Sequence, residues 1–265
     1  MNKFNKIGFL AEVDEFFKKL LWEKCSEELE LCTDFNQVAQ KLQYEISINN
    51  TSAKEIISAS LFARVLQSYQ AALLVAFKGM NYQVEVSIRC FLEPLFPLVA
   101  ISRNRDFHIK ILEASEIDRK KVFGKLINYK TRNKQYDEEL ERFKKLKSEI
   151  ESNIKENNLK SLSVYDCAKH AGLLDFYETL YSCTSTTLHS KVASLEEHLV
   201  LDVKNKKILA LKNEPEINGL NDSLVTLANC MGLAIQSVCE IFKLTEPNEI
   251  KDLANRLRDF RKYDA

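Results

Sequence analysis

Two side chains of opposite charge lie four residues apart in the stretch SIRCFLEPLF, which runs from Ser87 to Phe96. If this stretch is helical, Arg89 and Glu93 share one face and can form an ion pair. The residues around them are apolar, and a buried charge without a partner costs several kcal/mol. We therefore expect either an internal salt bridge that holds helices in register or a site where a ligand or a catalytic water meets fixed charges.

A histidine could join this pair. His189 stands near the end of a later predicted helix, one turn after Ser185. Histidine is the side chain best suited to exchange protons near neutral pH. If the helices pack suitably, Arg89, Glu93 and His189 form one cluster that is catalytic or senses a ligand. The alternative is that His189 satisfies a buried carboxylate, such as Glu93, and has a structural role.

The stretch RCFLEPL and the later stretch AGLLDFYETLYSCTSTTLHS together resemble an uncharacterised prokaryotic helical family, DUF5677, over about residues 58–199. The family pattern is Arg-x-x-x-Glu on a buried helix, then Gly-Leu-x-x-x-Tyr, then Ser-x-x-x-His. The matching residues here are Arg89 and Glu93, then Gly172, Leu173 and Tyr177, then Ser185 and His189. The sequence departs from the pattern in having Pro94 directly after the glutamate and Thr-Thr-Leu before the histidine. The resemblance implies a helical fold and brings no established activity.

A second motif lies in SRNRDFHI, where Arg103 is followed by Asn104 and, after four intervening residues, by His108. It resembles the Arg-x4-His motif of HEPN domains, many of which are metal-independent ribonucleases in toxin and phage-defence systems. In such enzymes the arginine stabilises phosphate charge and the histidine transfers a proton at the 2′-hydroxyl. The resemblance also implies a homodimer, which brings two motifs together, and RNA as substrate. The competing interpretation is a basic loop or a helix start.

The charge balance and the cysteine pattern narrow the possible classes of partner, cofactor and compartment. The chain has 265 residues with 38 basic and 38 acidic side chains, so it has no global electrostatic footprint for DNA. We expect no cofactor and no metal, because no Gly-rich phosphate loop, HExxH motif or close pair of metal ligands occurs. The seven cysteines are scattered without a Cys-x-x-Cys pair, as in reduced cytosolic proteins.

No membrane segment is expected. The first apolar stretch is interrupted by Glu12, Asp14 and Glu15, which does not fit a signal peptide. The longest apolar run, near Phe91 to Ile101, is too short to span a bilayer and contains two prolines. The sequence therefore predicts a cytoplasmic protein.

Long elements must position these residues, because the chain has only six glycines and four prolines. Apolar spacing predicts a first helix in GFLAEVDEFFKKLLWEKC and a second, capped at Thr33-Asp34. Later helices are predicted over about residues 53–79, 82–103, 106–128, 163–189, 221–242 and 247–263. Pro94 and Pro97 predict a kink or break near residues 91–95. The stretch LVLDVKNKKILALK predicts one small β-hairpin near residues 200–211.

The predicted fold is an all-α multi-helix bundle with that hairpin, forming a single domain over residues 1–265. The segment 133–158 is highly charged and carries a narrow apolar stripe. It is expected to be a protruding helical arm whose charges form a solvated face.

Two functional classes stay open. The first is a helical effector or binding module of a bacterial stress or phage-defence system, with a protein or RNA partner. The second is a HEPN-like ribonuclease toxin that uses Arg103 and His108, or Arg89 and His189. A catalytic site predicts polar groups converging in an open cleft. A binding module predicts that the Arg89 cluster is closed off by packing.

Overall fold

The computed structural model describes residues 3–188, 196–202, 204 and 206–260. The first elements are α1 (Lys3–Ile7), the short 3-10 turn η1 (Gly8–Leu10), α2 (Glu15–Glu45), α3 (Ala53–Ala76), α4 (Asn81–Arg103), α5 (Phe107–Arg132) and α6 (Glu138–Glu156). After them come α7 (Val164–His170), α8 (Leu174–Phe176), a π-helical turn (Tyr177–Tyr181) and α9 (Ser182–Leu188). The chain continues with a 3-10 turn (Glu196–His198), β1 (Leu199–Asp202), β2 (Lys207–Leu211), α11 (Leu220–Phe242) and α12 (Glu249–Phe260). The prediction of an all-α bundle with one small hairpin is confirmed.

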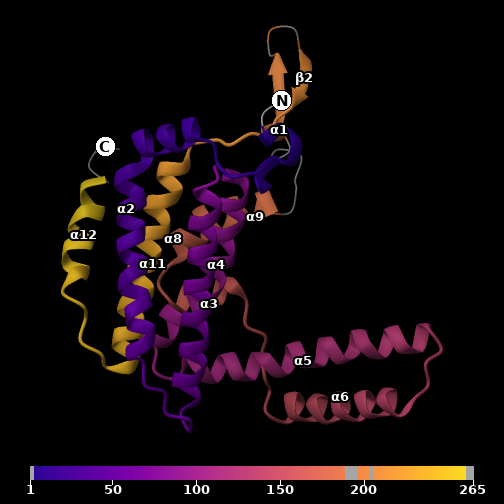
Figure 1. The fold of residues 1–265 in the computed structure, drawn as a ribbon. Helices are drawn as coiled ribbons and strands as arrows, with labels where there is room; N and C mark the ends of the chain where they lie inside the picture. The colour runs from indigo at the N-terminus through magenta and orange to yellow at the C-terminus, as the bar shows by residue number, and fades with distance from the viewer. Residues whose placement is uncertain (1–2, 189–195, 203, 205, 261–265) are drawn as a thin grey trace.

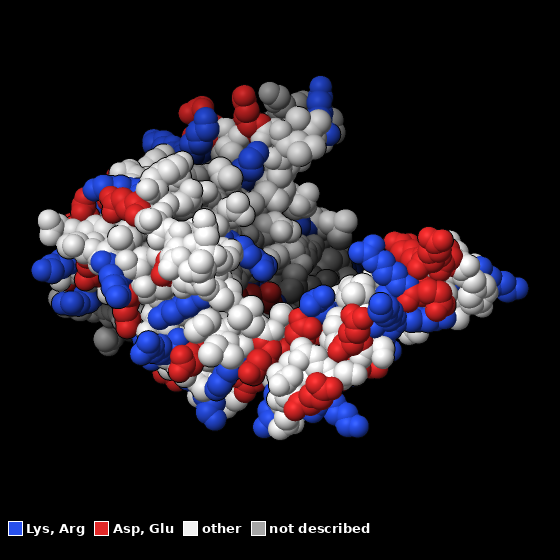
Figure 2. Space-filling model, turned by 90° about the horizontal axis from the view of Figure 1, so that it is seen from below, with Lys and Arg blue, Asp and Glu red and all other residues white. Residues whose placement is uncertain are grey.

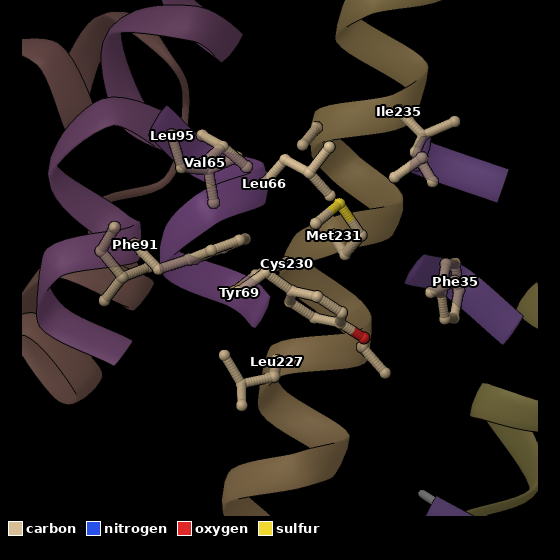
Figure 3. Close-up of a cluster of buried hydrophobic side chains, with 14 of the residues drawn as sticks. Phe35, Val65, Leu66, Tyr69, Phe91, Leu95, Leu227, Cys230, Met231 and Ile235 are labelled. Carbon is tan, nitrogen blue, oxygen red and sulfur yellow. The ribbon is translucent and has the colours of Figure 1, made fainter. Parts of the chain in front are cut away.

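The bundle is built around α2, α3, α4 and α11, with α12 along the outer side (Figure 1). Large side chains from these four helices converge in one core (Figure 3). Its fully buried members include Phe35, Tyr69, Phe91, Leu227 and Met231. Of the described helices, α11 is the one whose length and apolar composition would allow it to cross a membrane, and most of it is buried in this core.

α2 is a single helix rather than the two that the sequence predicts. Its backbone leaves helical geometry at Cys25 (φ −135°, ψ 16°) and then continues to Glu45. Thr33, which we expected to cap a new helix with Asp34, instead donates its hydroxyl proton to the carbonyl of Leu29 at 2.8 Å. Arg256 of α12 binds the Asp34 carboxylate. Thr33 and Asp34 therefore cap no helix. Thr33 bonds within α2, and Asp34 links α2 to α12.

α4 runs from Asn81 to Arg103 with both prolines inside it. Pro94 removes the N–H group that would bond the carbonyl of Cys90. The hydroxyl of Ser68 on α3 lies 3.4 Å from that carbonyl and donates to it. The prolines predict a kink or a break. The break does not occur in α4, because packing against α3 and α11 holds the helix and a neighbour supplies one missing donor.

α5 and α6 form a two-helix arm that projects from one end of the bundle (Figure 1). The rings of Phe123 and Phe143 meet between the two helices, 5.7 Å apart at their centroids. Lys130 near the tip of α5 contacts Asp137 at 2.7 Å and Glu139 at 2.6 Å. The segment 133–158 contributes α6, and the outer part of α5 completes the arm.

The hairpin lies at the opposite end of the bundle from the arm (Figure 1). β1 and β2 are antiparallel, with Leu199 opposite Leu211 and Asp202 opposite Lys207. The register shifts between Val200 and Leu201, as at a β-bulge.

Both signs of charge are interspersed on the face seen from below the bundle (Figure 2). Basic and acidic side chains alternate along the arm, where several of them pair. No large field of one sign is visible on this face, which agrees with the equal numbers of basic and acidic residues.

The hydroxyl of Tyr69 gives a test of the core. Tyr69 is fully buried on α3 and donates to the carbonyl of Cys32 on α2 at 2.9 Å. We expect Tyr69→Phe to lower the free energy of unfolding by about 1 kcal/mol, because a buried carbonyl loses a partner while the ring packing is kept. Urea denaturation measures the change. Tyr44→Phe removes a hydroxyl from a side chain that is 78% exposed and should leave the free energy of unfolding unchanged. Equal free energies of unfolding for wild type and Tyr69→Phe would show that this hydrogen bond does not stabilise the core.

Candidate functional site

Three polar side chains meet where α4 faces the π-helical turn. Nη2 of Arg89 donates to the hydroxyl of Tyr181 at 2.8 Å. That hydroxyl in turn donates to Oε1 of Glu93 at 3.1 Å. Nη2 of Arg89 also lies 3.4 Å from Oε1 of Glu93, so the expected ion pair is formed. The three groups form one short hydrogen-bonded network, which we call the Arg89 cluster.

The Arg89 cluster is closed on the arginine side and reaches the surface on the glutamate side. The Arg89 side chain is 12% exposed and the Glu93 side chain 43% exposed. The arginine carbon Cζ lies 4.2 Å from the centroid of the Tyr181 ring, so the guanidinium also makes a cation–π contact. Nη1 of Arg89 is buried and has no hydrogen-bond partner among the described residues. Because Glu93 is solvated, loss of Arg89 would not leave its carboxylate buried.

The electrostatic setting keeps Tyr181 protonated. Burial raises the pKa of its phenol to about 12, and the negative charge of Glu93 adds to the increase. A protonated phenol can donate to the carboxylate while accepting from the guanidinium, as the geometry requires. Such a group is a poor acid–base catalyst near neutral pH, because its pKa lies far from the working pH.

Local sequence features bring Tyr181 to α4. Ser163 and Asp166 form a reciprocal capping box at the start of α7. Gly172 takes a positive φ of 63° and turns the chain after α7. The following π-helical turn is held by the hydroxyl of Ser182, which donates to the carbonyl of Tyr177 at 2.9 Å. Wide turns of this kind occur often at functional sites because they re-aim side chains.

Tyrosine rings support this turn. The rings of Tyr177 and Tyr181 are stacked, 5.1 Å apart at 18°. Tyr165 of α7 meets Tyr177 edge-on at 5.5 Å. Tyr177 therefore supports the Tyr181 ring, which contacts the charged groups.

His189, which we expected in the Arg89 cluster, lies outside the described residues. Ser185, one turn before it, is half-buried in α9.

The second motif is divided between two local contacts. Arg103 is the last residue of α4, and its Nη1 donates to the carbonyl of Ala171 at the end of α7. A Cβ atom at Gly172 would lie 2.7 Å from that Nη1, so only glycine leaves room for the contact. His108 is in the first turn of α5, where its Nδ1 lies 3.2 Å from the carbonyl of Arg105. The two side chains bind different backbone segments.

Two hollows adjoin α4, one beside the Arg89 cluster and one at the start of the helix. A groove of about 340 Å³ between α4, α9 and α11 is lined by Ile88, Leu180 and Thr184, which neighbour the cluster residues, but not by Arg89, Glu93 or Tyr181. A cavity of about 160 Å³ lies at the start of α4, between Tyr82, His198 and Lys212. Within the part of the chain that the structure describes, no group of three or more His, Cys, Asp and Glu side chains could hold a metal ion.

The sequence profile of a family of unknown function, DUF5677, matches residues 55–208, more than half of the chain. The protein belongs to this family. The resemblance noted in the sequence is thereby confirmed, and the HEPN likeness stays a prediction. No curated protein and no solved structure matches the chain. The DUF5677 region contains all three members of the Arg89 cluster, together with Arg103 and His108.

Tyr181 is the site residue that the sequence did not reveal. Its signal was available in part, since the DUF5677 pattern includes Tyr177, and Tyr181 lies four residues later on the same helical face. Its contact with Arg89 joins residues 92 apart in the chain, which spacing along one helix cannot predict.

Removal of the Tyr181 hydroxyl tests the network. We expect Tyr181→Phe to lower the free energy of unfolding by about 1–2 kcal/mol, because Arg89 loses an acceptor and Glu93 loses a donor. Chemical denaturation measures the change. Tyr177→Phe is the matched control, since that ring packs in the same stack and no hydrogen bond of its hydroxyl is seen in the described part of the chain. Equal losses in both variants would mean that the hydroxyl of Tyr181 contributes nothing specific.

The raised pKa of Tyr181 predicts a pH dependence at high pH. Its phenol titrates near 10 in the unfolded chain and near 12 in the folded protein. Between these values the unfolded state loses its proton first, so this contribution to stability is complete below pH 10 and is lost as the pH rises toward 12. We expect the gap in unfolding free energy between wild type and Tyr181→Phe to narrow over this range. The other titrating groups are present in both proteins, so their contributions cancel in the difference between the two unfolding free energies. A gap that stays constant to high pH would contradict the assignment.

Proposed function

We propose that the protein is a helical effector or binding module of a bacterial stress or phage-defence system. The observation that carries this proposal is the burial of Arg89 and Tyr181 within the Arg89 cluster. Arg89 and Tyr181 are packed under the surface. The Tyr181 hydroxyl accepts a hydrogen bond from Arg89 and donates one to Glu93, so both of these bonds are made inside the protein. A substrate would have to displace these contacts before it could react. A network of this kind suits fixing the position of the π-helical turn and α9 on α4 better than catalysis.

The alternative function is a HEPN-like ribonuclease that uses Arg103 and His108. A group of basic side chains at the junction of α4 and α5 favours it. Lys110 lies 3.2 Å from Nε2 of His170, whose ring packs on Phe107, next to His108 in the chain. Against it stands the contact of Nη1 of Arg103 with the Ala171 carbonyl, which uses one of the guanidinium donors and holds the exposed side chain against the end of α7. We therefore rank the binding module first.

RNA integrity in induced cells separates the two functions. We would express wild type, Arg103→Ala/His108→Ala and His189→Ala, and follow growth and total RNA with and without phage infection. The binding module predicts intact RNA with wild type, and any effect on growth or infection should be retained by Arg103→Ala/His108→Ala. Circular dichroism would verify that each variant is folded.

Arg132→Ala/His198→Ala is the matched control, because it removes one arginine and one histidine elsewhere. RNA cleavage that is lost in Arg103→Ala/His108→Ala and kept in this control would overturn the proposal in favour of the ribonuclease. Cleavage lost only in His189→Ala would overturn it too, and would assign catalysis to the DUF5677 motif.

A further inference from the structure

The arm helix α5 has two different lengthwise faces. One face is covered by α6. Phe123 packs against Phe143, Lys120 lies 3.4 Å from Glu151, and Gly124 lies close to Lys147. The residues of this face are half-buried. They account for the packing of the arm itself.

The second face carries apolar side chains that α6 does not cover. Leu112, Val122, Leu126 and Tyr129 are 44%, 54%, 38% and 54% exposed. With Ser115 and Arg119, which are also exposed, they form a series at spacings of three and four residues. This is the spacing of a helix seam that packs against another helix. The seam is roughly 25 Å long at 1.5 Å per residue.

The bundle does not cover this seam, because the outer half of α5 projects away from it (Figure 1). Single exposed apolar residues are common on soluble proteins and need no explanation. A regular seam on a projecting helix is different, since every position of the series from residue 112 to residue 129 is exposed and four of the six positions are apolar. Such a surface marks an interaction site.

We propose that this seam of α5 is a self-association surface that packs antiparallel against the same seam of a second copy of the chain. An antiparallel pair related by a two-fold axis between Arg119 and Val122 is self-complementary. Leu112 then faces Tyr129 of the second copy, and Arg119 faces Val122 of the second copy. A two-fold interface uses the same patch on both subunits, so a single seam suffices.

Charge favours the antiparallel arrangement. Asp118 and Lys125 flank the seam on the same side and are both exposed. Asp118 contacts Lys121 of its own helix at 2.9 Å, and this solvated pair leaves its second carboxylate oxygen for a contact across the seam. In the antiparallel pair, Asp118 of each copy lies across from Lys125 of the other, which gives two contacts of opposite sign. A parallel pair would place Arg119 against Arg119 in the seam and Asp118 across from Phe123 of the other copy, which gives no contact of opposite sign. The seam therefore specifies one orientation. This inference does not depend on the proposed function.

The first test is the mass of the full-length protein by sedimentation velocity over a wide concentration range. An interface of this size is expected to be reversible, with a dissociation constant in roughly the micromolar range. We expect a monomer–dimer equilibrium in wild type, and at least a tenfold weaker dimer in Leu126→Glu. Asn128→Glu is the matched control, because it adds one carboxylate at an exposed position of the same helix outside the seam. Its dimer should be unchanged.

Charge reversal tests the orientation. Asp118→Lys and Lys125→Asp should each weaken the dimer, and the double variant Asp118→Lys/Lys125→Asp should restore it. A wild type that stays monomeric at all concentrations would overturn the proposal. A dimer that Leu126→Glu leaves intact would overturn it as well. If the protein is monomeric and Leu126→Glu instead weakens binding to a short RNA, the seam belongs to a nucleic-acid surface and self-association is wrong.

Discussion

The burial of α4 between α3 and α11 is the constraint on which the rest of the structure depends. Eleven of its residues are buried, including Phe91, Leu92, Leu95 and Phe96 in consecutive turns. Two sides of the helix are covered by apolar neighbours, so its charged residues can lie only on the remaining side. That side is where the segment from α7 to α9 packs, and Tyr181 is the group of this segment that meets the charges. The site is a consequence of how the core is closed.

The same packing explains how the DUF5677 region relates to the whole chain. The region spans α3 to the start of β2 and contains the arm, the Arg89 cluster and the Arg103 contact. It leaves out α2, α11 and α12, although α11 supplies Leu227 and Met231 to the core around Phe91 (Figure 3). The matched region alone would expose the apolar faces of α3 and α4 to water. In this protein the recognisable family segment carries the polar residues, and the flanking helices complete the core that holds them.

Much of the fold could be predicted from local patterns, because the helices have regular apolar spacing and the hairpin has alternating residues around a polar turn. The Arg89–Glu93 pair was predictable for the same reason, since its two members share one helix. What failed depends on neighbours far away in the chain. The prolines of α4 did not break the helix because α3 and α11 hold it and Ser68 donates to the Cys90 carbonyl. Thr33 and Asp34 did not cap a helix because α2 continues through them and α12 binds Asp34. The family pattern pointed only to the neighbouring Tyr177, and the role of Tyr181 depends on its contact with Arg89, 92 residues away.

The Arg89 cluster and the arm use charge in opposite ways. In the cluster, burial makes each contact specific, because a displaced guanidinium or phenol would lose its partner without gaining water. This favours a single position for the π-helical turn. In the arm, most charges are solvated, so ion pairs such as Lys121–Asp118 contribute little to stability. What distinguishes the outer face of α5 is its apolar seam, and its charges can only set the orientation of whatever packs there. The cluster therefore fixes the position of one segment on α4, and the surface that we propose for self-association lies on the arm.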